Sequence, residues 1–120
     1  MTTQSAEEAF RLLTLGEPRL LVSVVDPACP AVPRPLDERT QSLLRIGALV
    51  ALDAPESAYR TAVDTAMRAG ADLDDLLAVV AAVAGVVGSA RVISCAPRIA
   101  IAAGYDAEAA LDRLEPPRPR

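Results

Sequence analysis

Residues 36–70 constrain the fold most strongly, because they have the pattern of two helices joined by a short turn. Asp37 is a predicted N-cap, since its side chain can accept a hydrogen bond from the first helical turn. The apolar residues that follow recur at helical spacing, at Leu43, Leu44, Ile46, Gly47, Val50 and Ala51. Asp53-Ala54-Pro55 is predicted to end this helix, and Pro55 suits the first turn of the next one.

The second helix of this predicted hairpin carries a stripe of small side chains, which lets two backbones approach closely. The small residues are three or four positions apart, at Ala58, Ala62, Ala66 and Ala69. Gly70 is predicted to end the helix in a left-handed conformation. We expect everything C-terminal to Gly70 to pack against the hairpin.

The residues before the hairpin favour helices and a connector. Ser5 is predicted to cap a helix that ends near Thr14. Residues 18–25 could form a helix or a strand, and we favour the helix because a lone strand has no obvious partner. Four prolines in residues 26–35 predict an extended connector.

The residues after the hairpin also favour helices. Asp72 and Asp75 resemble a capping box at the start of a third long helix. That helix is apolar nearly all round, and its main face is predicted to be Leu73, Leu76, Leu77, Val80, Ala84 and Val87. A further helix is expected over residues 89–103, ended by Gly104, and a last short one from Asp106 to about residue 114.

These elements predict an all-α fold, a single small helical domain of about six or seven helices with a central helical hairpin. Its parts are the N-terminal helix or helices with the Pro-rich connector (1–35), the helical core (36–105), and the C-terminal helix and tail (106–120). No pair of strands is convincing in any part.

Composition excludes several classes of function. Apolar residues make up 52% of the 120 residues but aromatic residues only 2%, so the core must be built from Ala, Val, Leu and Ile. Such an apolar chain is expected to bury further surface by associating with copies of itself. The net charge of −4, with no lysine, argues against nucleic acid and anionic membranes as partners. The absence of histidine removes the usual general base and the commonest metal ligand, and we expect no metal or cofactor.

The cysteines and the N-terminal sequence predict a cytoplasmic protein. Cys29 and Cys95 are far apart and in no metal-like or CxxC spacing. Acidic residues stand where a signal peptide has basic ones, and no apolar h-region follows. The longest uncharged run, residues 76–90, is shorter than the about 20 residues that span a bilayer. Both thiols are therefore expected to be reduced.

The order of elements over residues 36–105 resembles the carboxymuconolactone decarboxylase family, which includes the alkylhydroperoxidase D-like proteins. The resemblance rests on LDERTQSLLRIGALVAL, on AYRTAVDTAMRAGA followed by an acidic capped helix, and on VAAVAGVVGSARV. It implies a small all-α unit that assembles into homotrimers or hexamers with pockets between subunits.

The motif of the redox branch of that family is missing. That branch has C-x-x-C-x-x-x-H at the start of the second hairpin helix and a glutamate in the helix before it. The corresponding positions here are Pro55, Ala58, Ala62 and Ser42. Without two thiols in reach of each other and a base, we do not expect antioxidant chemistry of the alkylhydroperoxidase or peroxiredoxin type. Glu56, Tyr59 and Arg60 resemble the acidic, aromatic and arginine positions of the decarboxylase branch, with Ala62 in place of its histidine.

Glu56, Tyr59 and Arg60 are the candidate catalytic residues. Glu56 could move protons, Arg60 could bind a carboxylate, and Tyr59 could donate a hydrogen bond to a developing enolate or lactone oxygen. In the alternative interpretation, Glu56, Arg60, Asp64 and Arg68 form a salt-bridge ladder on an exposed helix face. Tyr59 is then an aromatic residue at the edge of the core.

A second set of candidates lies on one face of a later helix, at Arg91, Ser94, Cys95 and Arg98. Two guanidinium groups aligned in this way could bind a small acidic metabolite through its carboxylate. Alternatively, the arginines are surface or subunit-interface residues with apolar stems, and Cys95 is a small buried apolar side chain.

Two functions therefore stay open. The chain could be a non-redox lyase or isomerase that acts on a small carboxylate or lactone metabolite, in which arginines and a tyrosine stabilise an enolate without histidine. It could instead be a catalytically inactive, oligomeric binding or structural protein. Whether it is an enzyme stays undecided at this stage, although analogy with the family favours the enzyme.

Overall fold

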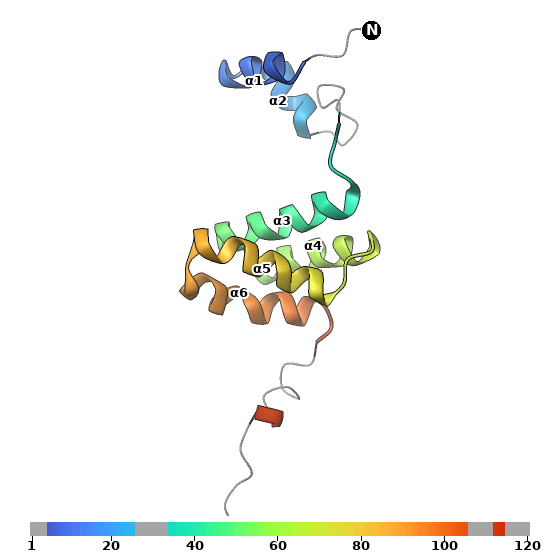
Figure 1. The fold of residues 1–120 in the computed structure, drawn as a ribbon, viewed down its shortest axis with the longest axis vertical. Coiled ribbons are helices and arrows are strands. Elements are labelled where there is room, and N and C mark those ends of the chain that lie inside the picture. Colours follow the sequence, from blue (N-terminus) through green and yellow to red (C-terminus); the bar gives the residue numbers. More distant parts are fainter. Residues whose placement is uncertain (1–4, 26–33, 106–111, 115–120) are drawn as a thin grey trace, which may run out of the picture. The chain divides into compact units, whose positions relative to one another are not determined.

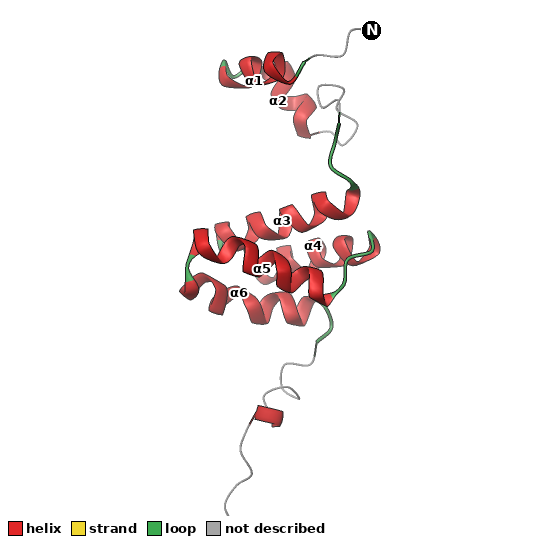
Figure 2. Cartoon of the chain, in the orientation of Figure 1, coloured by secondary structure: helices red, strands yellow, loops and turns green. Residues whose placement is uncertain are grey.

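The computed structural model describes residues 5–25, 34–105 and 112–114 (Figure 1). Six α-helices cover most of them: α1 (Ala6–Thr14), α2 (Pro18–Val25), α3 (Glu38–Leu52), α4 (Glu56–Arg68), α5 (Leu73–Val87) and α6 (Ser89–Ala102). A single helical turn lies at 112–114. Every regular element in the described residues is helical (Figure 2), so the predicted all-α class is confirmed.

The chain divides into two compact units, Met1–Leu36 and Asp37–Arg120. In the first unit, α1 and α2 pack against each other, and Leu20 is buried against Leu12 and Leu13. The Ser5 side chain accepts a hydrogen bond from the Glu8 backbone N–H at 3.2 Å, which confirms the predicted N-cap. Residues 18–25 are the helix that we favoured. Most of the predicted connector at 26–35, namely residues 26–33 with Cys29, lies outside the described residues.

The second unit is a bundle of α3, α4, α5 and α6 (Figure 1). Helix α3 packs against α4 and α5, and α6 packs against the same two helices. Helices α4 and α5 follow each other in the chain but make no contact through their described residues, so they lie diagonally opposite. The core between the four helices is built from Ile46, Val50, Tyr59, Val63 and Leu76, together with smaller residues.

The helix ends of this bundle follow the predicted local signals. The Asp37 carboxylate accepts a hydrogen bond from the Thr40 N–H at 2.7 Å. Asp72 and Asp75 form a capping box in which each side chain accepts from the other residue's N–H at 2.9 Å. Gly70 has a φ of +97°, as expected after the end of α4. Pro55 is the N-cap of α4, one position before the helical turn in which we had placed it.

The prediction for the core side of α5 was partly wrong. Leu76 and Val80 are buried, but Leu77 is 68% exposed and Leu73 is 49% exposed. The buried side of α5 is instead completed by Val79 and Val83, which approach α3 closely. A Cβ atom at Gly47 of α3 would lie 3.2 Å from Val83 Cγ1, so Gly47 is the residue that lets the two helices come together. Because α5 is apolar nearly all round, its sequence did not distinguish the two sides.

Gly88 separates α5 from α6, since its φ of +86° interrupts the helical backbone. Helix α6 contains Pro97 and is followed by Gly104, whose φ is +82°. The helix predicted from Asp106 falls outside the described residues except for its last turn at 112–114. Among the described helices, none is long and apolar enough to cross a membrane.

Candidate functional site

The charged candidates on α4 lie on its exposed face. Arg60 Nη2 lies 3.7 Å from Glu56 Oε1, and the two side chains are 73% and 55% exposed. One turn further, Arg68 Nε lies 3.2 Å from Asp64 Oδ2, again with both side chains mostly exposed. This is the arrangement that the salt-bridge interpretation expects. Each pair of this kind contributes little to stability in water.

Tyr59 is fully buried in the core whereas Glu56 and Arg60 are exposed to solvent, so the three side chains do not form one site. The Tyr59 hydroxyl has no hydrogen-bond partner among the described residues. Burial raises the pKa of Tyr59 above its ordinary value, because the phenolate would lose its hydration. A buried hydroxyl without a partner costs stability, and therefore needs an explanation.

The arginine candidates of α6 meet at Asp53, a residue that the sequence patterns had not singled out as functional. Arg98 Nη1 lies 3.2 Å from Asp53 Oδ1 and donates a second hydrogen bond to the Ala54 carbonyl at 3.0 Å. Arg91 Nη1 lies 3.5 Å from Asp53 Oδ2. Asp53 ends α3 in a left-handed conformation with φ +52°. The aligned guanidinium groups thus contact a carboxylate of the chain itself, and binding of a metabolite carboxylate stays a prediction.

Cys95 and Ser94 differ in their surroundings, although they are neighbours on α6. Cys95 is fully buried, and its thiol donates a hydrogen bond to the Val92 carbonyl at 3.4 Å. Burial raises the pKa of the Cys95 thiol, so it is a poorer nucleophile than an ordinary cysteine. Ser94 is exposed. Cys95 belongs to the same core as Tyr59, and the charges of Arg98, Arg91 and Asp53 act on both groups.

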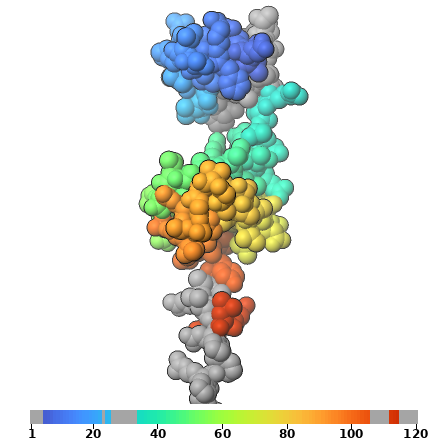
Figure 3. All heavy atoms as spheres, turned by 60° about the vertical axis from the view of Figure 1, so that its left-hand side comes forward, coloured from blue at the N-terminus to red at the C-terminus, as the bar shows by residue number. Residues whose placement is uncertain are grey.

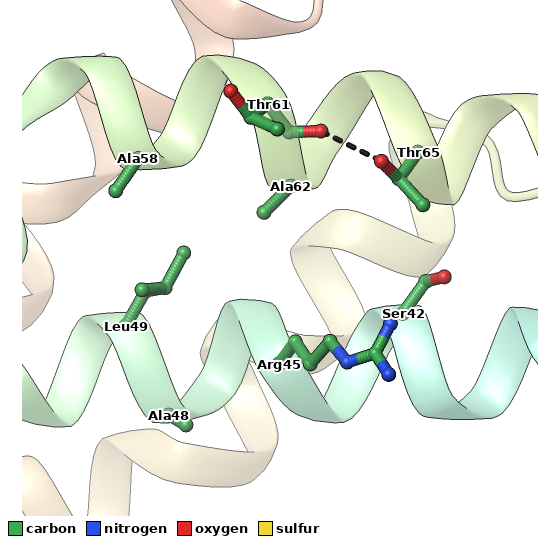
Figure 4. A pocket seen from close by; sticks show the side chains of 8 residues that line it. All are labelled: Ser42, Arg45, Ala48, Leu49, Ala58, Thr61, Ala62 and Thr65. Atoms are coloured by element: carbon green, nitrogen blue, oxygen red, sulfur yellow. Dashed lines mark hydrogen bonds between the residues drawn. The ribbon is translucent and has the colours of Figure 1, made fainter. Parts of the chain in front are cut away.

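An open groove runs between α3 and α4, with a volume of about 510 Å³ (Figure 4). Eight residues line it: Ser42, Arg45, Ala48, Leu49, Ala58, Thr61, Ala62 and Thr65. Four of them are alanine or leucine, so the groove is largely apolar. In Figure 4 the Arg45 side chain extends along α3 toward the end of the groove that holds Ser42. This volume lies within the range of about 300–1,000 Å³ that is typical of small-molecule sites.

Arg45 is distinguished by its lack of an ionic partner. Of the six arginines in α3, α4 and α6, the other five each form an ion pair, at Arg39, Arg60, Arg68, Arg91 and Arg98. Arg45 forms none with any residue that the structure describes. The sequence contains a signal for this, since no acidic residue lies three or four positions from Arg45 on its helix.

The three hydroxyl groups of the groove are partly satisfied by their own helices. Ser42 donates to the Glu38 carbonyl at 2.8 Å, and Thr65 donates to the Thr61 carbonyl at 2.9 Å. Thr61 donates to the Ser57 carbonyl at 3.4 Å. A hydroxyl oxygen has two lone pairs in addition to its hydrogen, so each can still accept a hydrogen bond from a ligand. The groove therefore offers a ligand one guanidinium cation, three hydrogen-bond acceptors and an apolar surface.

The groove also contains three of the four positions that correspond to the redox motif in the predicted family resemblance. Ser42, Ala58 and Ala62 line it, whereas Pro55 does not. A smaller groove of about 290 Å³ lies between α5 and α6 and includes Leu73, Leu77 and Tyr105. In the described residues no three Cys, Asp or Glu side chains are close enough to hold a metal ion.

No family model, curated protein or solved structure matches this chain. The resemblance to the carboxymuconolactone decarboxylase family therefore stays a prediction from the sequence pattern.

Proposed function

We propose that this chain is a binding protein for a small carboxylate with an apolar body, and that the α3–α4 groove is its site. One observation carries the proposal. Arg45 presents a guanidinium group without an ionic partner among the described residues, in a groove whose other residues are uncharged. A guanidinium group binds a carboxylate through two parallel hydrogen bonds, which makes this anion its natural ligand.

The rest of the groove defines the remainder of the ligand. Ala48, Leu49, Ala58 and Ala62 provide apolar contact for an aromatic or branched aliphatic group. The oxygen atoms of Ser42, Thr61 and Thr65 can accept a hydrogen bond, because their hydrogens already point to backbone carbonyls. A small acid that also carries a hydroxyl group would use both features.

We propose binding rather than catalysis because the lining of the groove includes no group that could act as an acid or base near neutral pH. Its polar side chains are one arginine and three hydroxyls. This agrees with the catalytically inactive, oligomeric binding protein considered from the sequence. We place it in the cytoplasm, where a free thiol such as Cys95 stays reduced.

A second candidate, a lyase or isomerase for a small carboxylate, is favoured by the unpartnered hydroxyl of Tyr59. In that function the phenol would donate a hydrogen bond to a developing enolate, while Arg91 or Arg98 would exchange Asp53 for the substrate carboxylate. This site and the groove are distinguishable, because they depend on different residues.

The test is calorimetric titration of the full chain with phenylacetate, mandelate and the neutral phenylacetamide. We expect Arg45→Gln to weaken phenylacetate binding about tenfold or more, since hydrogen bonds to charged groups contribute about 1.5–3 kcal/mol. Binding of phenylacetamide should change little. Arg68→Gln is the matched control, because it removes the same charge from an exposed position outside the groove.

Two further variants separate the alternatives. Ala62→Leu should weaken the acid and the amide alike, because it fills the groove without touching Arg45. Tyr59→Phe should bind phenylacetate as the wild type does. If Arg45→Gln binds phenylacetate normally while Tyr59→Phe loses it, the groove proposal is wrong and the second candidate is supported.

A further inference from the structure

Beyond its first turn, which contains Asp74, the outer face of α5 carries no charge and is open to solvent. It consists of Leu77, Ala78, Ala81, Ala82, Gly85 and Val86, all exposed. The two large side chains are among the most exposed apolar residues of the bundle, Leu77 at 68% and Val86 at 88%. No charged residue occurs between Asp75 and Arg91. In Figure 3 the atoms of α5 and α6, gold to orange, form a continuous surface.

This face continues into the α5–α6 groove, because Leu77 belongs to both. The large apolar side chains exposed on and beside these two helices are Leu73, Leu77, Val86, Ile93, Ile101 and Tyr105, each between 45% and 88% exposed. Together they offer apolar area on the order of several hundred Å². A standard protein interface takes about 800 Å² from each partner, and this apolar area approaches that value. Exposed apolar patches of this size usually mark an interaction site.

We propose that two copies of this chain associate through the outer faces of their α5 helices, packed antiparallel across a two-fold axis. A two-fold contact uses the same patch on both copies, so the patch must be complementary to itself. An apolar face without charges meets this condition, and a second copy is therefore a suitable partner. Between Leu77 and Val86 the face places no charge in the contact, so the net charge of −4 on each chain does not oppose association there. An anionic membrane or a nucleic acid would require basic residues, and this face has none.

The small residues determine how closely the helices can pack. Ala78 and Ala82 are four positions apart, as are Ala81 and Gly85, so both lie along the face as stripes without large side chains. A two-fold axis between Ala81 and Ala82 is equally distant in sequence from Leu77 and Val86. Leu77 and Val86 are nine residues, or about two and a half helical turns, apart, so they lie at the two edges of the contact with the small residues between them.

The charges at the start of α5 favour the antiparallel arrangement. Asp72, Asp74 and Asp75 form the acidic N-terminal end of this helix. Parallel packing would place these carboxylates beside their counterparts in the second copy, which is unfavourable. Antiparallel packing separates the acidic ends by the length of the helix and also opposes the helix dipoles. The inference is independent of the carboxylate proposal, because no residue of the α3–α4 groove lies on α5.

The test is the mass of the full chain in solution, measured by light scattering and by sedimentation at several concentrations. We expect the wild type to form a dimer, or a hexamer that contains three such contacts. Leu77→Glu should remove this contact and reduce the mass to the monomer or trimer. Leu44→Glu is the matched control, since Leu44 is a leucine of α3 with a similar exposure of 58%.

A cross-link gives a second measurement that does not depend on a destabilising change. Ala82→Cys, in a chain that also carries Cys29→Ser, should form an intermolecular disulfide under mild oxidation, because two copies of residue 82 meet near the axis. Ala48→Cys in the same background should not. A wild type that stays monomeric at high concentration would overturn the proposal. So would an assembly whose mass Leu77→Glu leaves unchanged, or an Ala82→Cys variant that forms no cross-link.

Discussion

Helices α4 and α5 occupy equivalent positions in the bundle but present different surfaces. Both pack their inner sides against α3 and α6, and they lie diagonally opposite each other. The outer side of α4 carries the ion pairs Glu56–Arg60 and Asp64–Arg68. Beyond Asp74 in its first turn, the outer side of α5 carries only leucine, alanine, glycine and valine. The two helices therefore both complete the core but expose different surfaces to solvent.

The difference shows that the inner and outer faces of these helices have separate roles. The inner faces determine the bundle, since Tyr59 and Val63 of α4 and Leu76 and Val80 of α5 belong to one core. The outer faces are the surfaces that other molecules can reach. The outer side of α4 is stable in contact with water because its charges are paired and hydrated. The exposed apolar side chains of α5 would be stabilised by an apolar partner that covers them. This contrast leads to four predictions, given in order of expected effect.

The largest effect on the free energy of unfolding is expected inside α5, where one of two adjacent leucines is buried and the other is exposed. Leu76 is 1% exposed and Leu77 is 68% exposed. Leu76→Ala should lower the free energy of unfolding by about 3 kcal/mol, because it leaves a cavity in the core. Leu77→Ala should change it by less than about 1 kcal/mol at low protein concentration. Urea unfolding of both variants checks this. Equal effects would mean that the two sides of α5 are wrongly assigned.

The contact between α5 and α3 at Gly47 should give the next largest effect. A Cβ atom there meets Val83 at 3.2 Å, so a branched side chain has no space. We expect Gly47→Val to destabilise the bundle by about 2 kcal/mol through overpacking. Gly47→Ala should cost less, because the gain in helix propensity offsets part of the crowding. Thermal unfolding measures both, and a Gly47→Val variant as stable as the wild type would contradict the close approach.

Tyr59 on α4 provides the third prediction. Its hydroxyl is buried without a partner among the described residues, and this costs stability. Tyr59→Phe removes the unsatisfied atom and keeps the ring, so we expect the free energy of unfolding to rise by about 1 kcal/mol. Chemical unfolding of the two proteins tests this. A loss of stability would show that the hydroxyl has a partner after all.

The smallest effect concerns the acidic end of α5 and depends on pH. The hydrogen bond from the Arg39 guanidinium, together with the Asp72 N–H, lowers the pKa of Asp75 from 3.8 to about 2. Because the folded pKa lies below the unfolded one, the contribution to stability is present above about pH 4 and is lost as the pH falls toward 2.

Arg39→Gln should therefore reduce the loss of stability between pH 4 and pH 2, when acid unfolding is followed by circular dichroism. Arg68→Gln on α4 is the control, because its partner Asp64 is exposed and lies at no helix cap. A wild-type acid profile that Arg39→Gln leaves unchanged would contradict the importance of this pair.

The helix ends could be predicted because each depends on residues within one turn. Asp72 and Asp75 needed only each other to form the capping box, and Gly70 needed only its freedom at positive φ. The orientation of α5 could not be predicted in the same way. With apolar residues on nearly all sides, only the packing against Gly47 and α6 decides that Leu76 is buried while Leu77 is exposed.

The candidate site was predicted in part. The alignment of Arg91 and Arg98 on α6 predicted a metabolite carboxylate, whereas both arginines contact Asp53, because a pattern within one helix gives no information about this distant residue. Arg45 could have been found from the absence of a nearby acid in its helix. That it faces an apolar groove depends on how α4 packs against α3, and no spacing within α3 contains that information.

The central claim is that the α3–α4 side of the bundle binds a ligand while the outer face of α5 binds a second copy. Methyl NMR of the full chain tests both halves in one experiment, by titration with phenylacetate and by dilution of the protein. We predict that phenylacetate shifts the methyl signals of Ala58 and Ala62, and that dilution shifts those of Leu77 and Val86. The claim would be contradicted if the same methyl groups responded to both titrations, or if dilution left Leu77 and Val86 unchanged.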